Sequence, residues 1–155
     1  MTKPILCLLL LACGAVACAV DPFGGDPRPE PAGGAWTKDP RGFRIGLSIE
    51  RDPIAPGEET LVTFIITNTS GTMTRIPTPD ATTLHWEVAG DADLDHETDH
   101  DGEMVILDPG ATRTARVAFQ WDRPGEYRIR ATLRAPGGGF EPVSSAPATV
   151  TVRSE

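Results

Sequence analysis

The feature that most constrains the fold of this chain is an alternation of apolar and polar residues with a period of two. In Phe43–Glu50 every second residue is apolar, and the same alternation recurs in Thr83–Val88, Thr114–Trp121 and Tyr127–Leu133. A period of two places successive side chains on opposite faces of an extended strand. The alternation therefore predicts half-buried strands, each with one face turned to a core.

Turn residues separate these segments. Asp52–Gly57, Asn68–Gly71, Asp108–Gly110 and Asp122–Gly125 are rich in Gly, Pro, Asn and Asp, which favour turns. Thr60–Asn68 is apolar at both parities, which is typical of a central strand. Further short strands are expected at Met73–Ile76, at Met104–Leu107 and around Ala148–Val152. Seven or eight short strands, with turn signals roughly every 8–12 residues and no helical periodicity, predict an antiparallel β-sandwich.

Three aromatic residues indicate an immunoglobulin-like arrangement of that sandwich. Tyr127 follows a tight turn at the start of the penultimate strand, as in a tyrosine corner, so its hydroxyl is expected to bond to the backbone across the turn. Trp86 is expected to take the buried position on a middle strand, without an accompanying disulfide. Trp121 is expected on the inward face of its strand. We therefore predict an all-β, immunoglobulin-like antiparallel β-sandwich over residues 43–153.

The N-terminus has the layout of a secretory signal. Lys3 precedes an apolar run, and small residues lead to Cys18. A cysteine directly after small residues resembles the lipobox of bacterial lipoproteins, in which that cysteine is acylated, with palmitate for example, and becomes the first mature residue. The resemblance implies a signal peptide at 1–17, lipid attachment at Cys18 with Cys13 as the alternative site, and anchoring to a membrane of the bacterial cell envelope, facing the periplasm or the exterior. A cleaved signal without lipid and a membrane-spanning anchor are the alternatives.

Residues 18–42 are predicted to form a disordered linker, because Asp21–Gly42 contains five prolines and five glycines and little apolar surface. All three cysteines lie within residues 1–18, so the predicted domain at 43–153 has neither a disulfide nor a thiolate site. The chain has 22 acidic and 14 basic residues. Cleavage of the signal peptide would remove Lys3 and leave 13 basic residues, which gives the mature chain a formal charge of −9. This balance disfavours nucleic acid as a partner.

Three segments together resemble the bacterial intracellular proteinase inhibitor family. They are Leu61–Ser70, then Leu107–Gly110 before a strand that ends in Trp121, and Pro124–Tyr127 at the start of the next strand. The resemblance implies a β-sandwich over about Phe43–Arg153 and inhibition of proteinases. The chain departs from the family between Pro77 and Met104, where it carries an acidic loop, and in having a signal segment.

The acidic loop 91–108 is the one stretch whose residues suggest metal chemistry. Its carboxylates fall on alternate residues, and its second half follows the spacing of an EF-hand loop, which binds Ca²⁺ through oxygen ligands. The competing interpretation is a solvated hairpin tip. His96 and His100, with His85, suggest a zinc site as a further alternative. The calcium ligands predicted from the spacing are Glu97, Asp99, Asp101, Glu103 and Asp108.

The sequence predicts no enzyme and no required cofactor. No Ser stands in a Gly-x-Ser-x-Gly pattern, no Cys remains after processing, and Gly137–Gly139 is followed by strand residues rather than by a helix that would hold a phosphate. Arg116, Arg128 and Arg130, with Arg134, are expected on the outer face of two adjacent strands. The predicted function is a non-catalytic, lipid-anchored envelope protein whose sandwich binds an unidentified protein or acts as a structural accessory. The alternative is a Ca²⁺-binding module.

Overall fold

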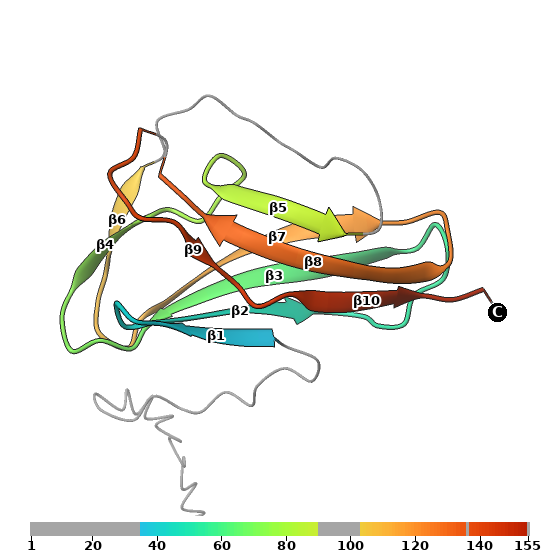
Figure 1. Ribbon diagram of the computed structural model, residues 1–155, viewed down its shortest axis with the longest axis horizontal. Coiled ribbons are helices and arrows are strands. Elements are labelled where there is room, and N and C mark those ends of the chain that lie inside the picture. Colours follow the sequence, from blue (N-terminus) through green and yellow to red (C-terminus); the bar gives the residue numbers. More distant parts are fainter. Residues whose placement is uncertain (1–34, 90–102, 136, 155) are drawn as a thin grey trace, which may run out of the picture.

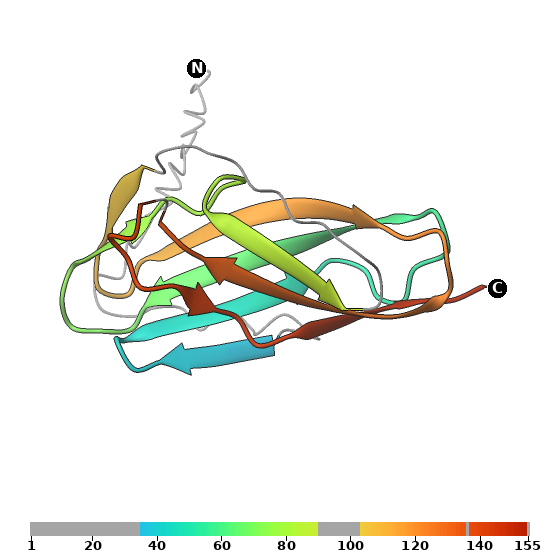
Figure 2. The ribbon, with the colours of Figure 1, turned by 45° about the horizontal axis from the view of Figure 1, so that its top comes forward.

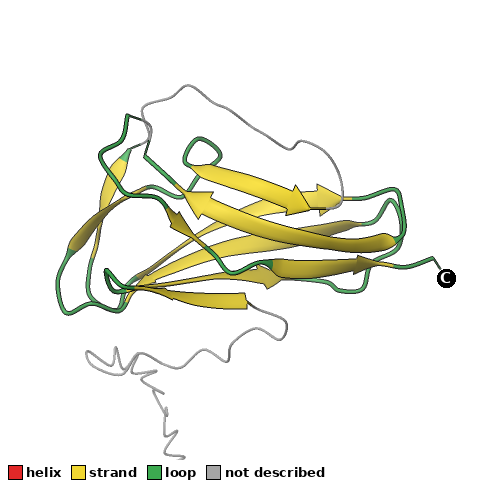
Figure 3. Cartoon of the chain, viewed as in Figure 1, coloured by secondary structure: helices red, strands yellow, loops and turns green. Residues whose placement is uncertain are grey.

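The computed structural model describes residues 35–89, 103–135 and 137–154. Within those residues the secondary structure consists of strands, without any helix, so no helix there is long and apolar enough to cross a membrane (Figures 1 and 3). The strands are β1 (Ala35–Asp39), β2 (Phe43–Ile49), β3 (Glu59–Asn68), β4 (Thr74–Pro77), β5 (Leu84–Ala89), β6 (Met104–Leu107), β7 (Thr112–Gln120), β8 (Gly125–Leu133), β9 (Val143–Ser144) and β10 (Ala148–Val152).

The strands form two facing layers. The first sheet has the order β1-β2-β3-β7, and the second has the order β10-β8-β5 with β9 also paired to β8. All these pairings are antiparallel. A third sheet of two strands, β4 and β6, lies at one end of the sandwich (Figure 1).

This order is that of an immunoglobulin-like sandwich. Strands β2, β3 and β7 correspond to A, B and E of the first sheet, and β5, β8 and β10 correspond to C, F and G of the second. Trp86 therefore lies on the C-type strand, and Tyr127 lies near the start of the F-type strand. The predicted fold class is confirmed.

The core lies between the sheets and follows the alternation in the sequence. Phe43, Ile45 and Leu47 of β2 are buried, as is every second residue of β3 from Thr60 to Asn68. The second sheet contributes Leu84, Trp86, Tyr127, Ile129, Ala131, Leu133, Ala148, Val150 and Val152. Residues 35–154 contain no cysteine, so no disulfide joins the two sheets. The apolar contact between their inner faces holds them together.

The turn at Asp108–Gly110 shows how the sequence fixes a strand boundary. Gly110 has a φ of 76°, a left-handed conformation that glycine adopts without steric cost. Its amide donates to the carbonyl of Asn68 at 2.7 Å, so the turn is bonded to the end of β3. The chain then enters β7 in register with β3 over nine residues.

Residues 35–39 differ from the sequence prediction, which placed 18–42 in the linker and expected seven or eight strands. They form β1, which pairs with β2 from Ala35↔Leu47 to Asp39↔Phe43. Trp36 lies against Gly46, where an added Cβ would come within 2.5 Å of the indole ring. Backbone pairing to the edge of β2 and this contact order residues 35–39, although the Pro/Gly-rich composition of Asp21–Gly42 as a whole favours disorder. Residues 40–42 of the predicted linker form the turn from β1 to β2, and residues 18–34 lie outside the described residues.

Arg41 connects the two sheets at the turn between β1 and β2. Its guanidinium donates two hydrogen bonds of 2.8 Å to the carboxylate of Asp39 and further ones to the carbonyl oxygens of Glu141 (2.7 Å) and Pro142 (3.3 Å). It also lies over the rings of Phe43 and Phe140, at 5.9 and 5.4 Å from their centroids. These contacts join the first sheet to the loop between β8 and β9, and we name them the Arg41 clasp.

Candidate functional site

The outer faces of the two sheets differ in chemistry. On the second sheet, Glu126, Arg128 and Arg130 of β8 and Glu87 of β5 are exposed, with Arg130 and Glu87 forming an ion pair of 3.8 Å. The outer face of the first sheet instead has apolar and hydroxyl side chains at its centre. Those of β3 are Leu61, Thr63, Ile65 and Thr67, all partly buried although they point away from the core.

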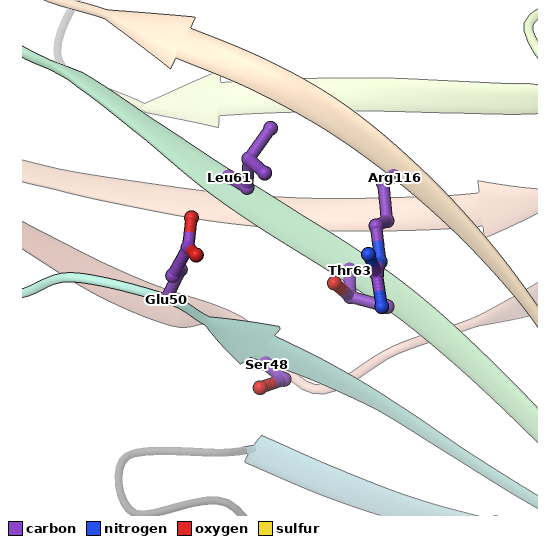
Figure 4. Close-up of a pocket in the computed structure, with 5 residues that line it drawn as sticks. All are labelled: Ser48, Glu50, Leu61, Thr63 and Arg116. Atoms are coloured by element: carbon purple, nitrogen blue, oxygen red, sulfur yellow. The ribbon is translucent and has the colours of Figure 1, made fainter.

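A shallow hollow of about 210 Å³ lies on this face, across β2, β3 and β7. Its side chains combine two hydroxyls, one apolar group and one charge of each sign, without a histidine or a cysteine. Figure 4 shows the Arg116 side chain lying over Thr63, with which it pairs across β3 and β7. The five residues are Ser48, Glu50, Leu61, Thr63 and Arg116. Such a set can receive a side chain of a partner by hydrogen bonding and charge.

Trp36 extends the same face toward β1. Its ring lies on Gly46, and the guanidinium of Arg44 stands 4.3 Å from the ring centroid. Gly46 pairs on its other side with Ile65 of β3. The indole, Ile65 and Leu61 therefore form an apolar strip, with the Arg44 guanidinium over the indole at one end and the hollow at Leu61. We name the strip and the hollow together the outer-face site.

The predicted arginine stripe is wrong as a single surface. Arg116 belongs to β7, which pairs with β3 in the first sheet, whereas Arg128 and Arg130 belong to β8 in the second sheet. Strands β7 and β8 are consecutive in sequence, but the turn between them crosses from one layer to the other (Figure 2). Alternation sets which face a residue takes; it does not set which sheet its strand joins.

The three aromatic residues singled out from the sequence lie together in the core. Trp86 is 8% exposed, Trp121 6% and Tyr127 5%. The Tyr127 hydroxyl donates to the carbonyl of Arg123 at 2.9 Å. Trp121 stacks on Tyr127 at 4.8 Å between centroids, and Phe119 bridges Trp121 to Trp86. This cluster supports the fold beneath the outer-face site and does not reach its surface.

The structure describes only two of the five predicted calcium ligands, Glu103 and Asp108. Glu97, Asp99 and Asp101 lie outside the described residues, as do His96 and His100. Glu103 and Asp108 are exposed, one on each side of β6, and His85 is on β5. Across the described parts of the chain no three His, Cys, Asp or Glu residues are grouped closely enough to hold an ion. The calcium and zinc interpretations stay predictions, and so does lipid attachment, because Cys13 and Cys18 precede the first described residue.

Two carboxylates have shifted ionisation. The side-chain hydrogen bond from Arg41 holds the pKa of Asp39 below its usual value. Burial acts to raise the pKa of Asp80, but hydrogen bonds from Thr82 and Thr83 outweigh it, so that pKa is also lowered. Both carboxylates stabilise turns and neither lines the hollow. The shifted groups are therefore structural.

Sequence reasoning missed most of the outer-face site. Trp36 was assigned to the linker, and Ser48, Glu50 and Thr63 were not singled out. One signal was present, because β3 is apolar at both parities although only one of its faces meets the core. Leu61 and Ile65 are the apolar residues of the second parity, and they mark the outer face.

No protein-family model matches the chain, and no curated protein sequence matches it. Among solved structures, a CARDB domain from Pyrococcus furiosus superposes with a TM-score of 0.42 and 17% identity, over 68% of this chain and 91% of that domain. The sporulation control protein Spo0M from Bacillus subtilis superposes with a TM-score of 0.47 and 16% identity, over 74% of this chain and 50% of Spo0M. The β-glucosidase EmGH1 from Erythrobacter marinus superposes with a TM-score of 0.45 and 14% identity, over 72% of this chain and 15% of the enzyme. This chain thus spans half or less of the last two proteins. Likeness at this level defines no activity, and the strand order itself defines the class as a small immunoglobulin-like β-sandwich.

Proposed function

We propose that this chain is a non-catalytic, lipid-anchored protein of the bacterial cell envelope whose sandwich binds a protein partner through the outer-face site. The observation that carries the proposal is the contrast between the two outer faces. On the second sheet the central strand β8 carries exposed charges of both signs. On the first sheet the central strand β3 carries no charge from Leu61 to Thr67, and an apolar strip with a tryptophan lies next to a hollow. Depletion of charge at the centre together with an aromatic residue is typical of protein interfaces.

The apolar residues of this strip have no role in the core. Leu61 and Ile65 point away from the core, where Val62, Phe64 and Ile66 of the same strand are fully buried. A polar residue at either place would keep the strand and remove apolar surface from water contact. A partner that covers the strip would remove Leu61 and Ile65 from water, which explains why apolar residues stand at these two positions.

Anchoring in the proposal rests on the sequence of residues 1–18 alone. Lipid on Cys18, or on Cys13, would tether the sandwich to an envelope membrane through the residues that precede β1. Replacement of each cysteine by serine, with labelled palmitate supplied to cells, tests this part. We expect Cys18→Ser to abolish labelling and Cys13→Ser to retain it, and the reverse result would move the attachment site.

The resemblance of Leu61–Ser70 and the two later segments to the intracellular proteinase inhibitor family suggests which partner to test first. Proteinases of the same envelope are the suggested class, and an inhibition assay with the full chain addresses them directly. Absence of inhibition would remove proteinases and leave the partner-binding proposal in place.

The direct test uses one charge placed on either outer face. Leu61→Lys puts a cation in the outer-face site, and Thr149→Lys puts one on the exposed outer face of β10 as a matched control. The tagged full chain is used to capture partners from envelope extracts, and both variants are first checked for a native circular dichroism spectrum. We expect Leu61→Lys to lose a partner that Thr149→Lys retains. Equal capture by both variants would contradict the use of this site.

A further inference from the structure

The first sheet ends on one side in β1, which has five residues, and on the other in β7, which has nine. Within the described residues β7 pairs with β3 alone, so its other side is a rim of the sandwich (Figure 2). The edge of the second sheet at β10 is treated differently. There Thr151 donates its amide to the carboxylate of Asp52 at 2.7 Å, and Ile54 donates to the carbonyl of Thr151 at 3.0 Å.

The backbone groups along the rim of β7 can be assigned by parity. The carbonyl oxygens of Ala111 and Trp121 accept hydrogen bonds from Asn68 and Gly57, on the β3 side. Backbone groups of an antiparallel strand point alternately to its two sides, so the odd-numbered residues face β3 and the even-numbered ones face outward. The outward residues are Thr112, Thr114, Arg116, Ala118 and Gln120, and all five are exposed.

This rim has few of the features that keep an edge strand from pairing. It contains no proline and no lysine, and its register with β3 runs without a bulge. Such an edge is a template for another extended segment. Its charged residues are Arg113 and Arg116, without an acidic residue in the strand, in a chain whose formal charge is −8.

A second copy of the chain fits this rim poorly. Two β7 strands paired antiparallel with full overlap would place Arg116 opposite Arg116, and like charges directly opposite one another are destabilising. An acidic segment has the complementary charge. Because Arg113 and Arg116 are three residues apart, their side chains project to opposite faces, and two carboxylates three residues apart would match both.

We infer that the rim of β7 receives an extended acidic segment of a partner protein as an added strand, with one carboxylate opposite Arg116 and a second opposite Arg113. The inference rests on the proposed function, since it specifies how the partner is held beside the outer-face site. Arg116 belongs to both, because it also borders the hollow. Backbone pairing gives affinity, and the two ion pairs select the segment.

The test uses capped nine-residue peptides of alternating valine and threonine with the full chain. One carries glutamate at its fifth and eighth positions, which lie opposite Arg116 and Arg113 when the peptide pairs antiparallel with the whole of β7. One carries lysine there, and one is the glutamate peptide with alternate amides N-methylated. Amide hydrogen exchange is measured by NMR. We expect the glutamate peptide to slow exchange at the five outward residues, with affinity that falls as salt rises, and we expect the lysine and methylated peptides to bind about tenfold more weakly or not at all.

Two pairs of variants separate charge from backbone pairing. Arg116→Glu should reverse the preference between the glutamate and lysine peptides, whereas Arg128→Glu, the same change on the second sheet, should leave it unchanged. Ala118→Pro removes one outward amide without touching the ladder to β3 and should abolish binding, whereas Ala118→Val should retain it. If Ala118→Pro does not fold, the methylated peptide tests the same ladder through its other half, because the peptide amides that it blocks would donate to the outward carbonyl oxygens of β7.

Several results would overturn the inference. They include unchanged exchange at the five amides, and equal effects of Arg116→Glu and Arg128→Glu. Self-association that Ala118→Pro abolishes would assign the rim to a second copy. The five outward amides of β7 could also exchange slowly in the chain without peptide, and faster once the carboxylates between 91 and 101 are neutralised. That result would assign the rim to this chain's own acidic segment. A partner captured equally by the wild type and Ala118→Pro, but lost by Leu61→Lys, would reject the rim and leave the proposed function standing.

Discussion

Replacement of Arg41 by alanine tests whether the Arg41 clasp holds the two sheets together. The clasp joins Asp39, two carbonyl oxygens of the loop between β8 and β9, and two aromatic rings. The Arg41 and Asp39 side chains are 31% and 15% exposed, so solvent screens part of their attraction. We take the ion pair as ~0.5–1 kcal/mol, each carbonyl bond as ~0.5 kcal/mol and the ring contacts together as ~0.5 kcal/mol.

The expected loss in Arg41→Ala is therefore about 2 kcal/mol in the free energy of unfolding at neutral pH. In a domain of this size each kcal/mol lowers Tm by about 4 °C, so Tm should fall by ~8 °C. Urea unfolding and thermal melts of the full chain measure both quantities. Arg128→Ala, an exposed change on the second sheet, is the control and should stay within ~0.5 kcal/mol of the wild type.

The pH dependence separates the ion pair from the other contacts. Arg41 lowers the pKa of Asp39 in the folded state, so the stability from this pair is present above the unfolded pKa of about 3.9 and is lost as pH falls through the lower folded pKa. The difference between wild type and Arg41→Ala should therefore narrow below about pH 4, while the carbonyl and ring contacts persist. A loss no larger than that of Arg128→Ala at neutral pH would refute the clasp. A difference that stays constant down to pH 2 would refute the share assigned to the ion pair.

Three further changes probe other parts of the sandwich. Asn68→Ala removes the buried amide that donates to the carbonyls of Thr72 and Leu107 at 2.8 and 2.9 Å, and urea unfolding should show a loss of ~2–3 kcal/mol; a loss under 1 kcal/mol would mean that water replaces the amide. Tyr127→Phe removes the hydrogen bond to Arg123 but keeps the stacked ring, so Tm should fall by only ~4 °C, and an unchanged Tm would deny the bond any net contribution. Gly46→Ala should displace the Trp36 ring and shift tryptophan fluorescence to longer wavelength without unfolding the core, whereas an unshifted spectrum would place the ring elsewhere.

The strands that the sequence predicted best are those whose alternation is complete. The strand predicted at Phe43–Glu50 agrees with β2 (Phe43–Ile49) to within one residue, because its inward residues are all apolar and a turn follows. Likewise Tyr127, Ile129, Ala131 and Leu133 of β8 are buried, as their spacing indicated. In both cases local sequence and burial give the same answer.

The features that the sequence did not predict depend on pairing between distant parts of the chain. Strand β1 forms because the edge of β2 accepts its backbone, and nothing within residues 35–39 requires this. The arginines were misassigned because the chain changes sheet between β7 and β8. The outer-face site was only partly visible, through Leu61 and Ile65, because Trp36 and Arg116 reach it from strands far apart in sequence.

The position of β1 also determines how the domain bears load. Residues 1–34 precede it, so a pull transmitted along that segment enters the sandwich at Ala35 and acts first on the pairing of Ala35 with Leu47. Strand β1 is joined to β2 by a tight turn, and a pull directed away from the sheet would open their ladder one pair at a time rather than shear it as a whole. Trp36 on Gly46 is the first side-chain contact that such a force meets. This hairpin would then yield before the core does, and residues 35–42 would be drawn out while the rest of the sandwich stays folded.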